Sequence, residues 1–288
     1  MFDVVIPTYQ IRPELIERCL ASIQTQQLVN SVVIVDGTPS SWDQYEEFYE
    51  TIAGYYSKLP LTYLRQTGIG VSQARNQGVK ASTSDYIAFL DGDDWWYPEH
   101  LSELALAIQQ APAKSVLFWN PMDTEVIMKT AKNEFRSQKL CNYFQNWNQW
   151  NSQAHSLYIW SHPVFPSSVA VLKSRFLEVG GFPEDLFSGE DVVCWVLMLQ
   201  NGYLGYQNDF VGGYHDLQHE FGGDGGFFAK NQHPLNNLYG DLAETKFQEN
   251  LDSRSKYFRF PDEKPTYLTN EEWEYLQNHN RMFLYRSL

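Results

Sequence analysis

The stretch YIAFLDGDD, residues 86–94, leads an apolar strand directly into a group of three carboxylates. Residues 86–90 are apolar nearly throughout, which is typical of a strand buried on both faces of a parallel sheet. In open α/β sheets, ligands bind just beyond the carboxyl ends of the strands, where these aspartates follow. Carboxylates this close repel one another unless a cation such as Mg²⁺ or Mn²⁺ joins them, and such ions commonly also hold a substrate's phosphates. The stretch predicts a divalent metal site that takes a phosphorylated ligand.

The same aspartates have a second interpretation, as an Asp-rich turn that caps a helix beginning near Pro98. Asp is favoured at helix N-caps and Pro in the first helical turn, and Asp-Gly is a common turn signal. The stretch taken alone leaves both interpretations open.

Composition excludes some classes of function. A chain of 288 residues that is 43% hydrophobic and 16% aromatic can bury a sizeable core, as one large domain or two small ones. A net charge of −14 argues against a nucleic-acid surface, which needs a basic face. To bind an anionic substrate, the protein would therefore need a bound cation or arginines in the site to neutralise the substrate's charge.

The cysteines and the N-terminus indicate the compartment. Cys19, Cys141 and Cys194 are odd in number and lack metal-type spacing, so we expect buried or free thiols and a reducing environment. Residues 1–7 carry no basic region before Pro7, and no apolar stretch is long enough to span a bilayer. We expect a cytoplasmic protein without a transmembrane segment.

The first third of the chain alternates between strand and helix patterns. Strands are expected over 3–6, 31–35, 61–65 and 86–90, and helices over 13–24 and 68–81. This order predicts a parallel, nucleotide-binding layer. The segment Gly68-Ile69-Gly70 nearly spells a dinucleotide-binding turn, but the third glycine is missing and the first strand, not this one, should carry that fingerprint.

Five motifs, each weak alone, occur together in a specific order. They are Pro7-Thr8-Tyr9 with Arg12, Asp36-Gly37, the run from Gly70 through Arg75-Asn76 to Gly78, Asp91-Gly92-Asp93-Asp94, and Gly180-Gly181-Phe182 with Gly189-Glu190-Asp191. In this order they resemble the motifs of inverting family-2 glycosyltransferases of the GT-A fold, over Met1 to about Tyr214. The ordered set favours the metal interpretation of the aspartates over the helix cap.

The resemblance implies an α/β fold with a mostly parallel central sheet flanked by helices, like that of nucleotide-diphospho-sugar transferases. The expected domain covers 1–215, with a nucleotide-sugar-binding half over 1–110 and an acceptor and base half over 111–215. A C-terminal helical extension would follow over 216–288.

The resemblance also implies which residues bind the donor. Pro7, Thr8, Tyr9 and Asp36 would contact the base and ribose, and Arg75 would lie beside the donor. A carboxylate at a strand end can accept hydrogen bonds from uracil or ribose, and a guanidinium offers a planar fork for anionic or carbonyl oxygens. For Thr8 and Tyr9, a turn-forming or packing role is the alternative.

The metal ligands follow from the same resemblance. Asp93 resembles the direct ligand of Mn²⁺ or Mg²⁺, and Asp91 the group that reaches the ribose, or the metal through water. Asp94 could be a further ligand, but a helix cap is favoured. Many relatives complete the site with a His from a later loop, for which His215 is the first candidate and His219 a weaker one; a turn or surface role is the alternative.

The catalytic base is expected in the second half of the chain. A strand over 166–172 and a helix over 173–179 precede Gly189-Glu190-Asp191, which opens a helix running to about Asn201. Asp191 resembles the family's base, which takes the proton of the acceptor hydroxyl during attack on the anomeric carbon. A purely electrostatic role at the helix N-terminus is the alternative, with Glu184 or Asp185 as substitute bases.

Two stretches depart from the family pattern. The aromatic and amide-rich residues 141–150 could bind sugars or simply pack on the core, and the glycine-rich residues 222–226 suggest a mobile loop. No glutamine-rich processivity motif follows Asp191, which favours the addition of a single sugar. The expected partners are a UDP-linked donor and a carbohydrate or lipid-linked acceptor, with peripheral membrane contact allowed and nucleic acid excluded.

Two other classes of function stay open at this point. A nucleotidyltransferase of similar topology should show a glycine-rich signature with Arg and Lys after the first strand, and residues 7–12 show none. A non-catalytic sugar-nucleotide or carbohydrate-binding module would keep Asp36 and Asp93 but would not need Asp191. Donor hydrolysis separates that module from an enzyme.

Overall fold

The computed structural model describes residues 1–129, 135–141, 164–186, 189–201, 203–208, 210–216 and 270. The strands are β1 (Phe2–Thr8), β2 (Val29–Asp36), β3 (Leu61–Arg65), β4 (Tyr86–Phe89), β5 (Trp95–Trp96), β6 (Ser115–Trp119), β7 (Met122–Lys129), β8 (Phe135–Cys141), β9 (Val169–Leu172), β10 (Leu204–Gln207) and β11 (Gly213–His215). The helices are α1 (Pro13–Gln24), α2 (Tyr45–Ala53), α3 (Val71–Ala81), α4 (His100–Gln110), α6 (Lys173–Glu178) and α7 (Glu190–Gln200), with a 3-10 turn η2 (Pro166–Ser168).

A seven-stranded sheet in the order β10-β6-β9-β4-β1-β2-β3 forms the centre of the molecule. β1 pairs in parallel with β2 and β4, and β2 pairs in parallel with β3, as the alternating pattern predicts. β9 runs antiparallel between β4 and β6, while β10 is parallel to β6. The expected α/β architecture with a mostly parallel central sheet is confirmed.

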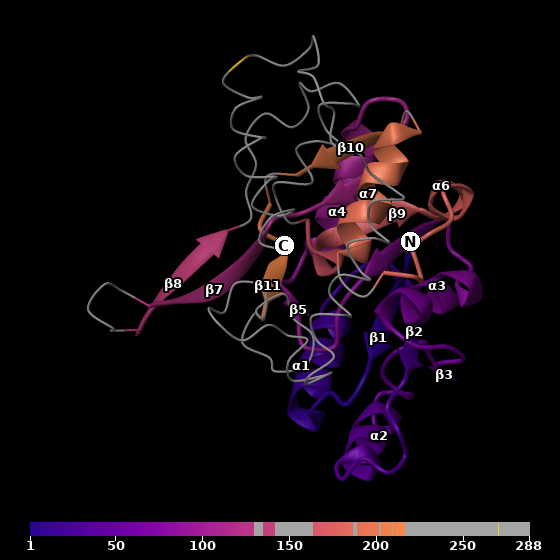
Figure 1. The fold of residues 1–288 in the computed structure, drawn as a ribbon, viewed down its shortest axis with the longest axis vertical. Helices are drawn as coiled ribbons and strands as arrows, with labels where there is room; N and C mark the ends of the chain where they lie inside the picture. Colours follow the sequence, from indigo (N-terminus) through magenta and orange to yellow (C-terminus); the bar gives the residue numbers. More distant parts are fainter. Residues whose placement is uncertain are drawn as a thin grey trace.

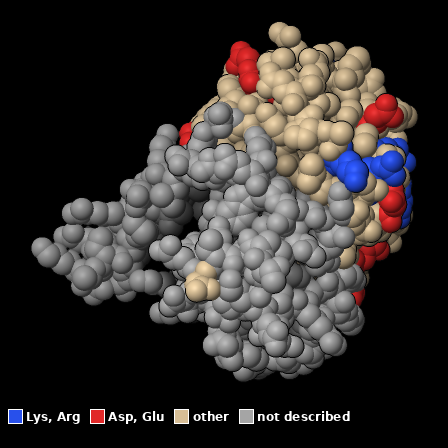
Figure 2. Space-filling model, turned by 90° about the horizontal axis from the view of Figure 1, so that it is seen from above, with Lys and Arg blue, Asp and Glu red and all other residues tan. Residues whose placement is uncertain are grey.

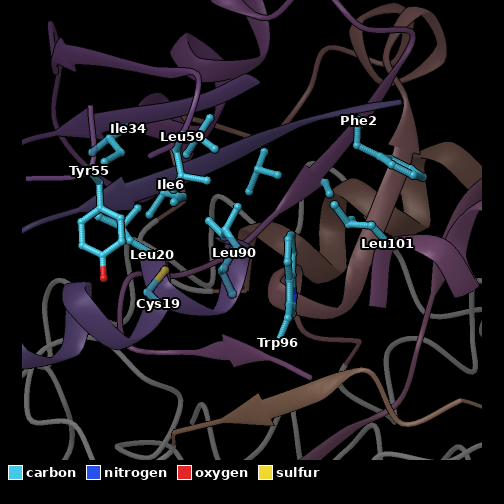
Figure 3. Packing of buried hydrophobic residues seen from close by; sticks show 14 of the residues in the cluster. Phe2, Ile6, Cys19, Leu20, Ile34, Tyr55, Leu59, Leu90, Trp96 and Leu101 are labelled. Carbon is cyan, nitrogen blue, oxygen red and sulfur yellow. The ribbon is translucent and has the colours of Figure 1, made fainter. Parts of the chain in front are cut away.

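Helices cover both faces of this sheet. Neighbouring residues of a strand point to opposite faces, and the central strands carry apolar residues at both sets of positions. Val4 and Ile6 of β1 belong to the core shared with α1, α2 and α4. Val5, between them, belongs to the core shared with α3, α6 and α7. Figure 3 shows the first of these cores, where Cys19 and Leu20 of α1 lie near Leu90 and Trp96.

The approach of α3 to β1 depends on a glycine. A Cβ at Gly78 would lie 2.4 Å from Cγ1 of Val5, closer than side-chain carbons come. Gly78 thus lets α3 lie directly on β1 and β2. This contact fixes the height of α3 above the sheet, and with it the position of Arg75 one turn earlier.

At the amino-terminal end of β1, the side chain of Asp3 attaches this strand to the turn between α3 and β4. Its carboxylate accepts hydrogen bonds from the backbone N–H groups of Thr83 and Ser84, the latter at 2.8 Å, and from Asn30 Nδ2 at 2.8 Å. Burial raises the pKa of Asp3, but these hydrogen bonds outweigh it and lower that pKa well below its usual range.

A four-stranded sheet in the order β5-β11-β7-β8 lies beside the central one. β11 pairs antiparallel with β5 and parallel with β7, and β7 and β8 form a hairpin that extends away from the main sheet in Figure 1. β5 follows the aspartate stretch directly. The small sheet therefore brings β11, which is distant in sequence, against that stretch.

Several expected boundaries are corrected. The helix expected from Gly68 begins at Val71, because Gly70 adopts φ +90° and cannot be part of it. The strand expected over 166–172 is η2 followed by β9, and α2 is an additional helix without a sequence prediction. The aromatic residues 142–150, the glycine-rich residues 222–226 and all of the expected C-terminal extension except Asp216 and Asn270 lie outside the described residues.

The surface and the thiols agree with the composition. Figure 2 shows Lys and Arg gathered in a small area next to Asp and Glu on the face it presents. Cys19 and Cys194 are free and buried, as expected. Among the helices of the described ranges, none is long and apolar enough to cross a membrane.

Candidate functional site

The predicted site residues of the first half meet at one edge of the central sheet, because the parallel strands that carry them end there. Thr8 at the end of β1 pairs with Asp36 at the end of β2. The backbone N–H of Leu90, just after β4, donates to the carbonyl of Val5 at 3.1 Å. Asp91 therefore begins at the same edge, with α3 behind it.

Asp36 is completely buried and its two carboxylate oxygens are engaged within the protein. Oδ1 accepts from Thr8 Oγ1 at 3.1 Å and from the backbone N–H of Thr38 at 2.8 Å. Oδ2 accepts from the Tyr63 hydroxyl and forms an ion pair with Arg65. In this arrangement Asp36 holds its neighbours in place, and Arg65, whose side chain is 48% exposed, is the charged member of the group that reaches the surface.

The loops after β1 and β2 are tied together at this end. Thr38 Oγ1 accepts from the backbone N–H of Gln10 at 2.8 Å, and the N–H of Gly37 donates to the carbonyl of Thr8 at 2.9 Å. Pro7 and Thr8 are buried, whereas the Tyr9 side chain is 48% exposed. Tyr9 is thus the predicted nucleoside contact whose ring is presented at the surface.

Arg75 links the two halves of the predicted site. Its Nη2 donates to both oxygens of Asp91, at 2.7 and 3.0 Å, and its Nη1 donates to Glu190 Oε1 at 2.8 Å. Burial alone would lower the pKa of Arg75, but Asp91 and Glu190 raise it well above its usual value. Arg75 is therefore a permanent cation between the aspartate stretch and the start of α7.

Asp191 follows Glu190 in the first turn of α7 and is 6% exposed. The contact between Arg75 and Glu190 places Asp191 next to the bridge that begins at Asp91. The Arg75 bridge thus brings the first turn of α7 close to the aspartate stretch. Glu184, one of the two alternatives to Asp191 as the base, belongs to the turn that precedes α7 and accepts a hydrogen bond from Asn76 at 3.0 Å.

Asp93 is half-buried and lies close to two other carboxylates. Burial, and then the charges of Asp94 and Asp91, raise the pKa of Asp93 well above its usual value. Its carbonyl oxygen accepts from Arg18 Nη2 at 2.8 Å, and that guanidinium also lies 3.7 Å from the centre of the Trp95 ring. A carboxylate whose charged form is disfavoured by burial and by neighbouring carboxylates is one that a bound cation would stabilise.

Asp94 is not a helix cap, so the favoured sequence interpretation of this residue was wrong. α4 begins at His100 after Glu99, without any side-chain cap. Asp94 Oδ2 instead lies 2.8 Å from His215 Nδ1, and Oδ1 accepts from the backbone N–H of Asp216 at 2.8 Å. The pairing of β11 with β5 creates this contact, which a local sequence pattern cannot reveal.

His215 of β11 lies beside the aspartate stretch, where it contacts Asp94. Burial would lower the pKa of His215, but Asp94 raises it to about 9. The ring stacks on Phe165 at 3.9 Å between centroids, and Nε2 is buried without a hydrogen-bond partner in the described part of the chain. A histidine held through Nδ1 by a carboxylate, with Nε2 left over, is a common arrangement for a metal ligand.

The donor set fits a divalent ion in part. Asp93 and His215 offer a carboxylate and an imidazole with a supporting carboxylate behind it, ligand types that Mn²⁺ accepts. Across the described residues, however, no group of three or more His, Cys, Asp and Glu side chains is already arranged to hold a metal.

Sequence reasoning missed two supporting residues. Ser167 of η2 is completely buried; its Oγ accepts from the backbone N–H of Asp91 at 3.0 Å and its carbonyl accepts from Trp96 Nε1 at 2.6 Å. Asn76 of α3 contacts Phe182 and Glu184. Asn76 belongs to one of the ordered motifs, so a signal existed, whereas nothing around Ser167 distinguishes it.

The family described as "Glycosyl transferase family 2" matches residues 3–173. The succinoglycan biosynthesis protein ExoW of Rhizobium meliloti is 38% identical over 102 residues, which are 34% of this chain and 31% of that protein. Validoxylamine A glucosyltransferase of Streptomyces hygroscopicus is 27% identical over 217 residues, covering 67% of this chain and 50% of that protein. The chain thus spans half or less of the length of these relatives.

Solved structures show the same fold at low sequence identity. TarS 1-349 of S. aureus in complex with UDP-GlcNAc has a TM-score of 0.59 and 18% identity, over 98% of this chain and 80% of that one. The mannosyltransferase PcManGT of Pyrobaculum calidifontis in complex with GDP-Man and Mn²⁺ has a TM-score of 0.59 and 19% identity, over 99% and 72%. The fold is that of GT-A glycosyltransferases.

Proposed function

We propose that this chain, which belongs to glycosyl transferase family 2, moves a single sugar from a UDP-linked donor to an acceptor hydroxyl with inversion and with the help of a divalent metal. The observation that carries the proposal is the Arg75 bridge, which joins Asp91 at the donor edge to Glu190 beside Asp191. The bridge places Asp91, the proposed donor-side carboxylate, and Glu190, which precedes the proposed base, on two sides of one buried cation. Structures of the same fold with UDP-GlcNAc and with GDP-Man support a nucleotide-sugar donor.

The nucleoside would lie at the ends of β1 and β2. The Tyr9 ring is exposed enough to offer a face to the base, and Pro7 and Thr8 fix the loop that carries it. Both oxygens of Asp36 already accept hydrogen bonds within the protein. Asp36 would therefore either position the residues that donate these bonds or replace one of the bonds by a hydrogen bond from the nucleoside. Both roles keep Asp36 at the nucleoside end of the site.

The leaving group is a nucleoside diphosphate, which departs with added negative charge. Asp93 and His215 would hold the metal, with Asp91 reaching the ribose, or the metal through water. A bound divalent cation supplies Lewis-acid stabilisation of that charge without a proton donor. Asp94 would accept a hydrogen bond from the Nδ1–H of His215 and so leave Nε2 as the ligand atom.

Asp191 would be the base. Its carboxylate takes the proton from the acceptor hydroxyl while the hydroxyl oxygen attacks the anomeric carbon on the side opposite the departing diphosphate. One base is enough for inversion. Glu190 stays paired with Arg75 and takes no proton in this step. The acceptor would be a carbohydrate or a lipid-linked sugar that the protein meets in the cytoplasm.

A panel of nucleotide sugars tests the proposal. Each is added with Mn²⁺ in a thermal-shift assay, and the donor that stabilises the protein most is then followed for sugar release to water or to an acceptor. We expect one UDP-sugar to bind and to be turned over. Binding without any turnover across a broad acceptor panel would favour a non-catalytic sugar-nucleotide-binding protein.

A further inference from the structure

Both the oxygen and the nitrogen of the Asn76 side-chain amide form hydrogen bonds with the backbone of one distant residue, Phe182. Asn76 Oδ1 accepts from the N–H of Phe182 at 2.9 Å, and Asn76 Nδ2 donates to the carbonyl of Phe182 at 2.8 Å. The same Nδ2 donates to Glu184 Oε1 at 3.0 Å. A side chain that satisfies both backbone groups of one residue fixes its position as a neighbouring strand would.

The local backbone is built for this close approach. Gly181 adopts φ +75°, and a Cβ at this position would lie 2.5 Å from Asn76 Oδ1. The N–H of Gly181 donates to the carbonyl of Phe176 at 3.0 Å, so the turn is also attached to α6. Gly181 is therefore needed both for its backbone conformation and for the space that the Asn76 amide occupies.

The neighbouring residue of α3 holds the other end of the same segment. Arg75 donates to Glu190 at 2.8 Å, while Asn76 binds Phe182. The Phe182 ring packs edge-on against Trp195 of α7, with 5.4 Å between ring centroids. Consecutive residues of one helix thus contact both ends of the segment that leads into α7, and the aromatic contact links that segment back to α7.

We infer that Asn76 is a positioning residue for the base: it sets where α7 begins, and so where Asp191 lies relative to Asp91. The inference rests on the proposed function in assigning the proton transfer to Asp191. The Asn76 side chain contacts the turn before α7, whereas the contact with Asp91 comes from Arg75. Loss of Asn76 should therefore displace the base and leave the donor site in place.

The first test does not depend on activity. Asn76→Ala removes the acceptor of the Phe182 N–H, and hydrogen exchange of that amide, followed by NMR, should speed up by at least about tenfold. Asn30→Ala is the matched control, because Asn30 also donates two hydrogen bonds, to Asp3 and Thr83, but at the opposite edge of the sheet. Unchanged exchange of the Phe182 amide in Asn76→Ala would overturn the inference.

The second test separates positioning from a general loss of stability. Because a displacement of about 1 Å can cost about 10²-fold in rate, kcat for sugar transfer should fall by about 10- to 100-fold in Asn76→Ala. The affinity for the UDP-sugar should stay within about twofold, and Asn30→Ala should keep both. Wild-type kcat in Asn76→Ala, or equal losses of kcat and donor affinity, would refute the positioning role.

Two further measures keep the result interpretable. If Asn76→Ala does not fold, Asn76→Asp replaces it, since it keeps the size and the Oδ1 acceptor but loses the donated bonds; the same loss of kcat at constant donor affinity is expected. Glu184→Gln keeps an acceptor for Asn76 Nδ2 and should retain transfer. A wild-type protein without any transfer would contradict the proposed function, and the exchange measurement would still decide whether Asn76 holds the turn.

Discussion

Asp94→Asn should weaken metal binding even though Asp94 is not proposed as a ligand. The Asp94 side chain is completely buried and holds His215 through Nδ1 at 2.8 Å. An asparagine amide can present its NH₂ group to Nδ1, which favours the tautomer with the proton on Nε2 and removes the lone pair that a metal needs. Loss of such supporting carboxylates commonly costs about 10- to 100-fold in metal affinity, or about 1.4 to 2.7 kcal/mol.

The assay is a titration of Mn²⁺ by calorimetry at saturating UDP, near pH 7. Asp43→Asn, an identical change at an exposed position of the described chain, serves as the control and should bind Mn²⁺ like the wild type. Circular dichroism checks that Asp94→Asn is folded. A folded Asp94→Asn protein with wild-type affinity for Mn²⁺ would refute the proposed arrangement of Asp94 behind His215.

Three further predictions use other residues. UDP and Mn²⁺ together should raise the melting temperature by more than the sum of their separate effects, and Asp93→Ala should abolish that excess; strictly additive shifts in the wild type would contradict it. Asp3→Asn should lower the free energy of unfolding by about 2 kcal/mol at pH 7. The pKa of Asp3 is lowered in the folded protein, so below about pH 4 the carboxyl of the unfolded chain binds a proton while that of the folded chain stays ionised. The difference in unfolding free energy should therefore shrink as the pH falls below about 4, and a difference that stays constant down to pH 2 would contradict this prediction. Gly78→Ala should cost about 1–3 kcal/mol in urea unfolding, because its Cβ would meet Val5, and an unchanged midpoint would show that α3 can shift without cost.

The central strands and most helix positions could be predicted because their sequence patterns are local. β3 and α1 have the predicted bounds, and β4 and α7 differ from them by about one residue. Apolar runs that end in Asp36 and Asp91 also indicate which edge of the sheet carries the site, since the carboxyl ends of parallel strands meet there. The sequence could therefore predict that these candidate site residues lie at the same end of the strands.

The partners of the site residues could not be predicted, because they come from distant parts of the chain. Asp94 contacts His215 and Asp216 through the pairing of two short strands, and Arg75 meets Glu190 only after α3 and α7 pack on the same face of the sheet. Asp36 looked available to a ligand from its position after β2, yet Tyr63 and Arg65 of the neighbouring strand engage it. A strand-end position predicts where a side chain lies and says little about what already occupies it.

The proton-transfer step tests the account most directly, through Asp191→Asn measured beside Glu190→Gln. Asparagine keeps the size and shape of Asp191 but cannot take a proton, so transfer to an acceptor should fall by about 10² to 10⁴. The affinity for the UDP-sugar should change by less than about twofold, and Glu190→Gln, which keeps an acceptor for Arg75, should cost less. Near wild-type transfer by Asp191→Asn, at unchanged donor affinity, would contradict the assignment of Asp191 as the base.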